Sequence, residues 1–228
     1  MQKKLYLVST PIGNYDDITL RALRILKEVD FIICEDTRVT SVLLKHYDIQ
    51  KELVSMNAQS EPRKIPHLLE RIKNGESCAL VSDAGTPSVS DPGIRLISEA
   101  IKNNISVIPV PGVSALIAAL SISGLPADSF AFEGFLPQKK GRMTKLKQLS
   151  VEERTIVLYE STYRIEKLLK ELNEFMPERY IVICRELTKK FEEVRRGYPE
   201  QLLDSFKDKV NKGEFVIVIA PKNWKVYK

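Results

Sequence analysis

The chain has 228 residues, and its 35 Lys and Arg exceed its 30 Asp and Glu to give a formal net charge of +5. A hydrophobic share of 43% beside 29% charged residues excludes an intrinsically disordered chain, and the length admits one large or two small globular domains. The first residues carry two lysines before a short apolar run, without the length or the cleavage pattern of a signal peptide. We therefore expect a cytoplasmic protein with a packed core.

Short apolar runs alternate with amphipathic stretches along the chain, which is typical of parallel α/β architecture. Several runs are apolar on both faces, as strands covered by helices on both sides should be. In chain order we predict strands over residues 5–9, 30–34, 78–82, 105–110, 129–133, 155–159, 180–184 and 215–220. The predicted helices cover residues 18–29, 63–74, 92–103, 113–124, 163–175 and 199–210.

Two α/β lobes are expected, because a turn at Pro111-Gly112 closes a first series of strands and helices and a second series follows it. The predicted lobes are residues 1–112 and 113–228, each with a mixed or parallel sheet. The turn-rich stretch 124–129 is too short to tether two separate domains, so the lobes should pack together.

One uncharged stretch, residues 105–127, has about the length of a transmembrane helix. Pro109, Pro111 and Gly112 interrupt it, so it predicts a buried strand, a turn and a short buried helix rather than a membrane span.

The cysteines and histidines indicate neither a disulfide framework nor a metal site. Cys34, Cys78 and Cys184 stand singly within or beside β-branched apolar runs, which is typical of buried thiols in a reducing compartment. His46 and His67 are too far apart in sequence to form a local ligand motif, so we expect no metal.

Unusual loops follow several predicted strands, at the carboxyl ends where ligands collect in open α/β sheets. They read STPIGNYDD, EDTR, SDAGTPSVSDPG and PGVSA, and their small residues let a backbone approach a ligand closely. The motifs of dinucleotide oxidoreductases, P-loop NTPases, α/β-hydrolases and zincins are missing from them. For each loop, turn formation alone is the alternative interpretation.

Seven segments together resemble the motifs of one known family, in the same order and over nearly the whole chain. They are LYLVSTPIGNYDDITLRAL, CEDTR, LVSDAGTPSVSDPG, IPVPGVSALIAAL, GLPADSFAFEGFLPQKKGR, YESTYRI and RELTKKFEEVRRG. They resemble the small-subunit ribosomal RNA 2′-O-ribose methyltransferase I family, whose members have the tetrapyrrole-methylase-like (class III) fold. In YESTYRI, Thr162 and Tyr163 depart from the family, which more often has Pro-His there.

The resemblance implies a two-lobed α/β homodimer that binds S-adenosylmethionine in the cleft between its lobes. It places the cofactor on Pro11, Gly13, Ser82, Asp83, Ala84, Gly85, Thr86, Ser114, Ala115, Phe135 and Leu136. Phe135 and Leu136 are expected to make apolar contacts, and Asp83 to face the ammonium group of the cofactor. Many relatives carry a further C-terminal helical segment, which we expect to be absent here.

The implied reaction needs a group that accepts the proton of a ribose hydroxyl, because that hydroxyl is a weak acid. Methyl transfer from a sulfonium is an in-line displacement, so alignment of the reactants supplies much of the acceleration. We predict Glu35 and Asp36 as the catalytic carboxylates. The alternative is that one of them caps a helix beginning near Arg38.

Basic residues near the predicted cleft indicate RNA as the partner. Arg38 and the loop residues Lys139, Lys140 and Arg142 are predicted to contact phosphates, although a solvated lysine-rich surface is the alternative. A second basic cluster, 189–196, supports either interpretation equally.

The implied substrate is a cytidine in the decoding region of small-subunit ribosomal RNA, in the assembled subunit. Two other functions stay open: a tetrapyrrole-type small-molecule methylase of the same fold, and a non-catalytic RNA-binding assembly factor.

Overall fold

The computed structural model describes residues 3–206 and 212–225 and divides the chain into two compact units, Met1–Ser114 and Ala115–Lys228. This division lies two residues after the predicted boundary at residue 112. Each unit has its own sheet and its own hydrophobic core.

The first unit is built on a five-stranded, entirely parallel sheet in the order β3-β2-β4-β1-β5. Its strands are β1 (Lys4–Val8), β2 (Phe31–Cys34), β3 (Glu52–Ser55), β4 (Cys78–Leu80) and β5 (Ser106–Val110). Its helices are η1 (Tyr15–Asp17), α1 (Leu20–Glu28), α2 (Thr37–His46), α3 (Glu61–Lys73) and α4 (Ile94–Lys102).

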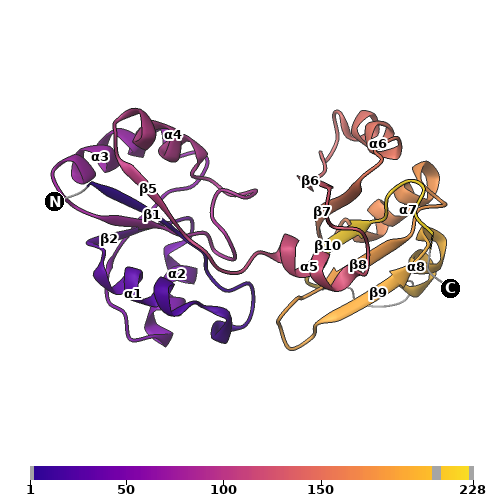
Figure 1. Cartoon of the computed structure of the whole chain (residues 1–228), viewed down its shortest axis with the longest axis horizontal. Coiled ribbons are helices and arrows are strands. Elements are labelled where there is room, and N and C mark those ends of the chain that lie inside the picture. The colour runs from indigo at the N-terminus through magenta and orange to yellow at the C-terminus, as the bar shows by residue number, and fades with distance from the viewer. Residues whose placement is uncertain (1–2, 207–211, 226–228) are drawn as a thin grey trace. The chain divides into compact units, whose positions relative to one another are not determined.

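Helices cover both faces of this sheet (Figure 1), because successive side chains of each strand point to opposite faces. In β2, Phe31 and Ile33 join a core with α3 and α4, while Ile32 and Cys34 join a second core with α1 and α2. The central strands are therefore buried on both sides, as their uninterrupted apolar sequences predict.

The second unit has a mixed five-stranded sheet in the order β6-β7-β10-β8-β9. Only β6 and β7 are parallel, and the other neighbours are antiparallel. Its strands are β6 (Phe130–Phe135), β7 (Thr155–Ser161), β8 (Ile181–Arg185), β9 (Glu193–Gly197) and β10 (Glu214–Ile219). Its helices are α5 (Ala115–Ser123), α6 (Arg142–Ser150), α7 (Ile165–Phe175) and α8 (Pro199–Phe206).

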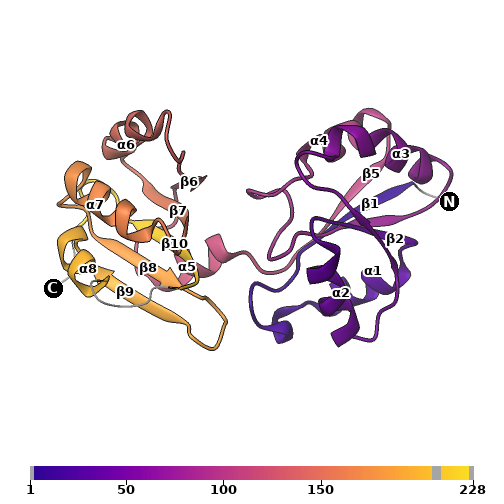
Figure 2. The same cartoon turned by 180° about the vertical axis from the view of Figure 1, so that it is seen from behind.

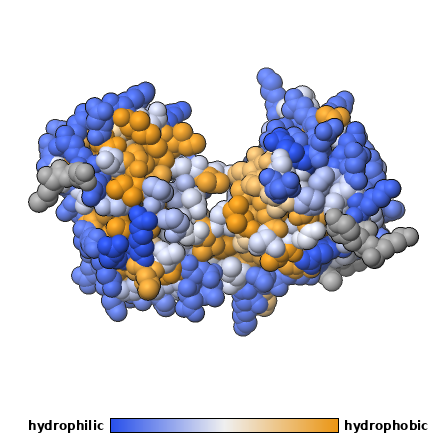
Figure 3. Space-filling model, in the orientation of Figure 1, coloured by the Kyte–Doolittle hydropathy of each residue, from blue (hydrophilic) through white to orange (hydrophobic). Residues whose placement is uncertain are grey.

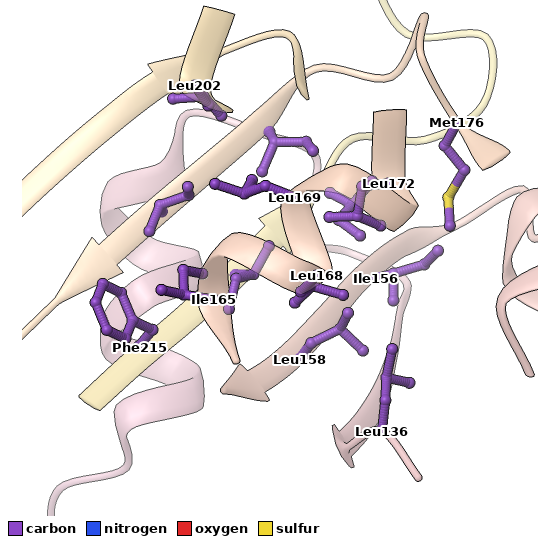
Figure 4. Packing of buried hydrophobic residues seen from close by; sticks show 14 of the residues in the cluster. Leu136, Ile156, Leu158, Ile165, Leu168, Leu169, Leu172, Met176, Leu202 and Phe215 are labelled. Atoms are coloured by element: carbon purple, nitrogen blue, oxygen red, sulfur yellow. The ribbon is translucent and has the colours of Figure 1, made fainter. Parts of the chain in front are cut away.

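One large hydrophobic core lies between this sheet and the helices α6, α7 and α8 (Figures 2 and 4). Leu168 and Leu172 of α7 project onto Ile156 and Leu158 of β7, and all four are fully buried. Helix α5 packs against β10, and the Leu116 amide donates a hydrogen bond to the Tyr159 hydroxyl of β7.

The mixed and parallel sheets confirm the predicted α/β class, but β3, β9, η1 and α6 were not predicted. Helix α2 was expected only in the alternative in which Glu35 or Asp36 caps a helix beginning near Arg38. Strand β5 is an edge strand with half-exposed residues, so the prediction of a fully buried strand there is wrong. The predicted helix 199–210 is present as α8 through Phe206, and its remainder lies outside the described residues.

Hydrophilic residues dominate the face of each unit shown in Figure 3, with hydrophobic patches between them. Exposed apolar side chains include Ile117 and Ile122 of α5. Within residues 3–206 and 212–225, no helix is long and apolar enough to cross a membrane. The same residues contain no group of three or more metal-binding side chains.

Candidate functional site

The loops that follow β1, β2, β4 and β5 hold most of the predicted site residues. Parallel strands end at the same edge of a sheet, so these loops gather beyond the carboxyl edge of the first sheet. Backbone hydrogen bonds join the first loop to the third. The Thr10 amide donates to the Gly85 carbonyl at 2.9 Å, and the Gly85 amide donates to the Thr10 carbonyl at 3.0 Å. The Thr10 hydroxyl donates to the Ser82 carbonyl at 3.1 Å.

Hydrogen bonds between hydroxyl groups also connect the same loops to the loop after β5. The Thr86 hydroxyl donates to the Val113 carbonyl at 3.0 Å and lies 3.0 Å from the Ser9 hydroxyl. Since the single Thr86 proton is directed at Val113, Ser9 is the donor to Thr86. Thr86 therefore fixes the backbone next to Ser114.

Two glycines allow this close approach. Gly85 has φ +81°, and a Cβ there would lie 3.3 Å from Cγ2 of Ile12. A Cβ on Gly112 would lie 2.8 Å from Cβ of Ser9, closer than side chains pack. Any larger residue at either position would push the loops apart.

The predicted cofactor residues of these loops differ in exposure. Pro11, Ser82 and Gly85 are buried, Gly13, Asp83 and Ala84 are exposed, and Thr86, Ser114 and Ala115 are half-buried. Ser114 ends the first unit, and Ala115 begins α5 of the second.

Asp36 caps α2, as the alternative interpretation of the acidic pair predicts. Its Oδ1 accepts a hydrogen bond from the Arg38 amide at 2.8 Å, and its Oδ2 lies 2.6 Å from Nη2 of Arg38. These hydrogen bonds lower the pKa of Asp36 to about 2. A carboxylate held in this way is a weak base and is already occupied, whereas the Arg38 side chain is exposed.

Glu35 is half-buried, and no Lys or Arg within residues 3–206 and 212–225 forms an ion pair with it. Burial raises the pKa of Glu35, and the negative charges of Asp83 and Asp36 raise it further. Asp83 is exposed as a residue, but partial desolvation of its carboxyl raises its pKa, against a hydrogen bond that its Oδ1 accepts from the Asp36 amide at 3.2 Å. Of the two predicted catalytic carboxylates, Glu35 has the properties of a proton acceptor.

Asp91 joins these carboxylates and was not predicted as a site residue. Burial and the charges of Glu35 and Asp83 raise the pKa of Asp91 to about 6, against a hydrogen bond from Ser82. The sequence offered one indication of Asp91, namely a charged residue inside SDAGTPSVSDPG. Because Asp-Pro-Gly commonly begins a helix, Asp91 is interpreted from sequence as a turn residue.

The segment before α4 is held in unfavourable backbone conformations. Ser88 and Ser90 have φ of 68° and 70°, in the left-handed region that L-residues rarely adopt. Gly93 has φ 127°, and a Cβ there would lie 2.7 Å from Cδ2 of Leu80. Such strain persists only where the surrounding structure enforces it, and it concentrates at functional sites.

In the second unit, the structure separates the two predicted apolar contacts. Phe135 is 51% exposed, and its ring centroid lies 5.7 Å from that of Tyr159 and 5.6 Å from the Arg164 guanidinium. Leu136 is buried in the core beneath α6 and α7 (Figure 4). The Leu136 side chain thus packs within this unit, and its contact with a cofactor stays a prediction.

The predicted RNA-binding residues of the basic loop before α6 also differ in exposure. Lys139 and Lys140 are exposed. Arg142 is only 3% exposed, and its guanidinium is hydrogen-bonded to Glu171 and to the Pro137 carbonyl. Arg142 is therefore engaged inside the second unit, and its predicted contact with phosphates has no support from its position.

The sequence pattern of the family described as Tetrapyrrole (Corrin/Porphyrin) Methylases matches residues 4–203. Solved structures of similar fold include cobalt precorrin-4 methyltransferase, with a TM-score of 0.71 at 19% identity over 96% of this chain and 95% of that one. Diphthine synthase aligns with a TM-score of 0.75 at 17% identity, over 95% and 90% of the two chains.

Much closer sequence relatives carry the name ribosomal RNA small subunit methyltransferase I. The Thermotoga maritima protein is 45% identical over 96% of this chain and 99% of its own length. The Halalkalibacterium halodurans protein is 45% identical over 97% of this chain and 77% of its own length. The chain therefore belongs to the tetrapyrrole methylase family and, within it, to the group of ribosomal RNA small subunit methyltransferase I proteins.

Proposed function

We propose that this S-adenosylmethionine-dependent methyltransferase acts on small-subunit ribosomal RNA and methylates the ribose 2′-hydroxyl of a cytidine in the decoding region. The main support for an RNA substrate is the 45% identity, over nearly the whole chain, to relatives named ribosomal RNA small subunit methyltransferase I. The motif resemblance supports the finer details, namely the cytidine, the 2′-hydroxyl and the assembled subunit. Such a substrate places the enzyme in the cytoplasm, where we propose that it acts as a homodimer.

The loops of the first unit fit the methyl donor. Asp83 presents an exposed carboxylate, which suits the ammonium group of the methionine moiety. Gly85 lacks the Cβ that would crowd Ile12, so the backbone beside it is open to close approach. When bound, S-adenosylmethionine supplies an electrophilic methyl group on a sulfonium. Pro11, Gly13, Ala84, Ser114, Ala115 and Phe135 are the further residues that we propose hold it.

Glu35 is the proton acceptor in this proposal. Its pKa is raised by burial and by Asp83, so it binds the hydroxyl proton more strongly than an ordinary carboxylate. Asp36 instead holds the start of α2 and orients Arg38. Because Asp36 and Glu35 are adjacent, the cap also fixes the backbone that carries the base.

Exposed cations supply the attraction to RNA. Lys139 and Lys140 are exposed and available to phosphates, and the chain as a whole carries a net charge of +5. Arg38 is also exposed, but its Nε and Nη2 already bond Asp36, so only the rest of its guanidinium could meet a phosphate. Each phosphate contact releases counterions, so binding should weaken steeply as salt rises.

The test is methyl transfer from radiolabelled S-adenosylmethionine to small ribosomal subunits purified from cells that lack this enzyme. We expect one labelled cytidine in the decoding region, mapped by nuclease digestion and mass spectrometry. Naked ribosomal RNA and a uroporphyrinogen substrate form the comparison arms, and no transfer to any RNA would refute the proposal.

Glu35→Gln tests the base. General-base catalysis typically contributes about 100-fold to 10,000-fold, so kcat should fall by that factor while the Kd for S-adenosylmethionine stays unchanged. Glu28→Gln, at the exposed end of α1, is the control.

A further inference from the structure

An aromatic ring stands exposed at the tip of the β8–β9 hairpin. The two strands are joined by residues 186–192, and Phe191 in this turn is 67% exposed. Lys190 lies beside it, with Nζ 5.7 Å from the ring centroid. A phenylalanine gains nothing for folding from such a position, since its apolar surface stays in water.

The turn that carries Phe191 is held in one conformation. Glu186 and Thr188 adopt φ of 51° and 66°, in the left-handed region. The Lys189 amide donates to the Glu186 carbonyl at 3.0 Å, and the Thr188 amide donates to Oε2 of Glu192 at 2.6 Å. Two strained residues in a hydrogen-bonded turn indicate a conformation retained for a purpose beyond joining two strands.

The same turn is anchored to the neighbouring strand β10. Nζ of Lys189 lies 2.9 Å from Oε1 of Glu186 and 2.7 Å from Oε2 of Glu214. Gly213 has φ 127°, and a Cβ there would lie 2.6 Å from Cγ of Glu186. The base of the hairpin is therefore rigid, and its tip presents Phe191 on a fixed support.

The basic cluster 189–196 is mostly neutralised. Lys189 is paired with two carboxylates, Arg195 has Nε 2.7 Å from Oε1 of Glu193, and Arg196 donates to the Ile122 carbonyl. Lys190 has no ion pair with any residue in 3–206 or 212–225. Lys190 is thus the one cation of the cluster that has neither an ion pair nor a carbonyl partner in that part of the chain, and it lies next to the exposed ring.

We propose that Phe191 stacks on an unpaired base of the RNA substrate while Lys190 contacts the adjacent phosphate. The inference rests on the proposed function, because it takes RNA as the partner. An exposed ring beside a cation matches the way proteins bind single-stranded nucleic acid, through base stacking and backbone attraction. Unpaired nucleotides are also the parts of folded RNA that proteins recognise by stacking.

The test compares three substitutions at one position. Phe191→Ala should raise KM for small subunits by about 5-fold to 100-fold, the usual effect of losing one stacked base. Phe191→Trp should restore the wild-type KM, whereas Phe191→Leu, which keeps apolar surface without an aromatic face, should not. The kcat and the Kd for S-adenosylmethionine should stay unchanged in all three.

A binding assay gives a readout that does not depend on methyl transfer. Trp224 is the single tryptophan of the chain, so Phe191→Trp in a Trp224→Phe background carries one indole, at position 191. Its fluorescence should be quenched by a single-stranded oligoribonucleotide and not by an RNA duplex. Lys190→Gln should lower the slope of log KM against log salt by about one.

Val151→Ala and Lys222→Gln are the controls, since both remove an exposed side chain of the same unit. The inference fails if Phe191→Ala leaves KM unchanged, or if Phe191→Leu behaves as wild type. It also fails if Phe191→Ala changes the oligomeric state in sedimentation, which would assign the ring to a protein interface. Absence of methyl transfer by the wild-type enzyme would count against the proposed function, whereas the quenching experiment tests the stacking separately.

Discussion

Arg142 binds the Glu171 carboxylate through two of its N–H groups: the single Nε–H is shared between both carboxylate oxygens, each at 2.9 Å, and Nη2 donates to Oε2 at 2.7 Å. The pair joins the first residue of α6 to α7 inside the second unit. Nη1 of Arg142 also donates to the Pro137 carbonyl at 3.0 Å, where the loop carrying Lys139 and Lys140 begins. Arg142 therefore holds both ends of this loop, which explains an arginine in the motif without assigning it to RNA.

Glu171→Gln should destabilise the protein by roughly 1.5 to 3 kcal/mol, because it removes the charged hydrogen-bond acceptor of buried Arg142 and leaves only the Glu160 carboxylate, 3.8 Å away, to balance its charge. Urea unfolding at pH 7 measures the loss. Glu166→Gln on the same helix is the control, since Glu166 pairs with Lys170 at 2.7 Å with both side chains 61% exposed. That exposed pair should be worth less than about 1 kcal/mol. Equal losses in the two variants would contradict the buried-pair interpretation.

Arg179 is buried in the second unit and stabilises it without an ion pair to any carboxylate in the described part of the chain. It donates to the backbone carbonyls of Leu149, Glu152, Arg154 and Ala220. Arg179→Met would leave these carbonyls without a donor, at about 1 to 3 kcal/mol for each one that stays buried. We expect a lower unfolding midpoint than for Arg154→Gln, which removes an exposed cation from the same region. A larger loss in Arg154→Gln would overturn this ranking.

The strands and most helices could be predicted because their apolar patterns are local. Two strands could not be predicted from an apolar pattern. β3 has only four residues at the edge of its sheet, and β9 reads EVRRG, whose charged residues do not form a typical strand pattern. Tertiary pairing with β2 and β8 makes these segments strands, and no local pattern carries that information.

The candidate site was predictable in its location and not in the state of its side chains. Lys140-Gly141-Arg142 reads as one basic surface, but the partner of Arg142 is 29 residues away in sequence. Glu35 and Asp36 are indistinguishable as neighbours in CEDTR, and only the start of α2 assigns the cap to Asp36. Asp91 could not be identified from the sequence, because its raised pKa comes from burial and from the charges of Glu35, in another loop, and Asp83, eight residues before it.

Gly85→Ala should weaken S-adenosylmethionine binding, measured by calorimetry. The new Cβ would lie 3.3 Å from Ile12, and φ +81° is strained for any residue with a side chain. Gly124→Ala separates these effects: Gly124 has φ +73° with nothing within 4 Å of the new Cβ. Both variants should lose about 1 to 2 kcal/mol of stability from the backbone, but only Gly85→Ala should raise the Kd for the cofactor. Equal Kd values would contradict the proposed place of Gly85.

Asp91→Asn should stabilise the protein at neutral pH. The folded-state pKa of Asp91, about 6, lies above the ordinary value of 3.8. The stability contributed by protonated Asp91 is therefore fully present below pH 3.8 and is lost as pH rises through about 6. Asparagine does not ionise, so the gain in unfolding free energy should be near zero at pH 4 and reach about 1 to 3 kcal/mol above pH 7.

Asp36→Asn should change the free energy of unfolding in the opposite direction. The pKa of Asp36 is lowered to about 2, so its contribution to stability is present above the ordinary value of 3.8 and is lost as pH falls through about 2. The variant should be less stable than the wild type at pH 7, and the difference should shrink in acid. Urea unfolding of Asp91→Asn between pH 4 and pH 8, and of Asp36→Asn between pH 2 and pH 7, covers both titrations. If Asp91→Asn destabilised the protein at pH 8, ionised Asp91 would be stabilised by a partner in the fold. In that outcome the ionised carboxylate of Asp91 would stabilise the fold, and the raised pKa of Asp91 would not identify it as a residue of the candidate site.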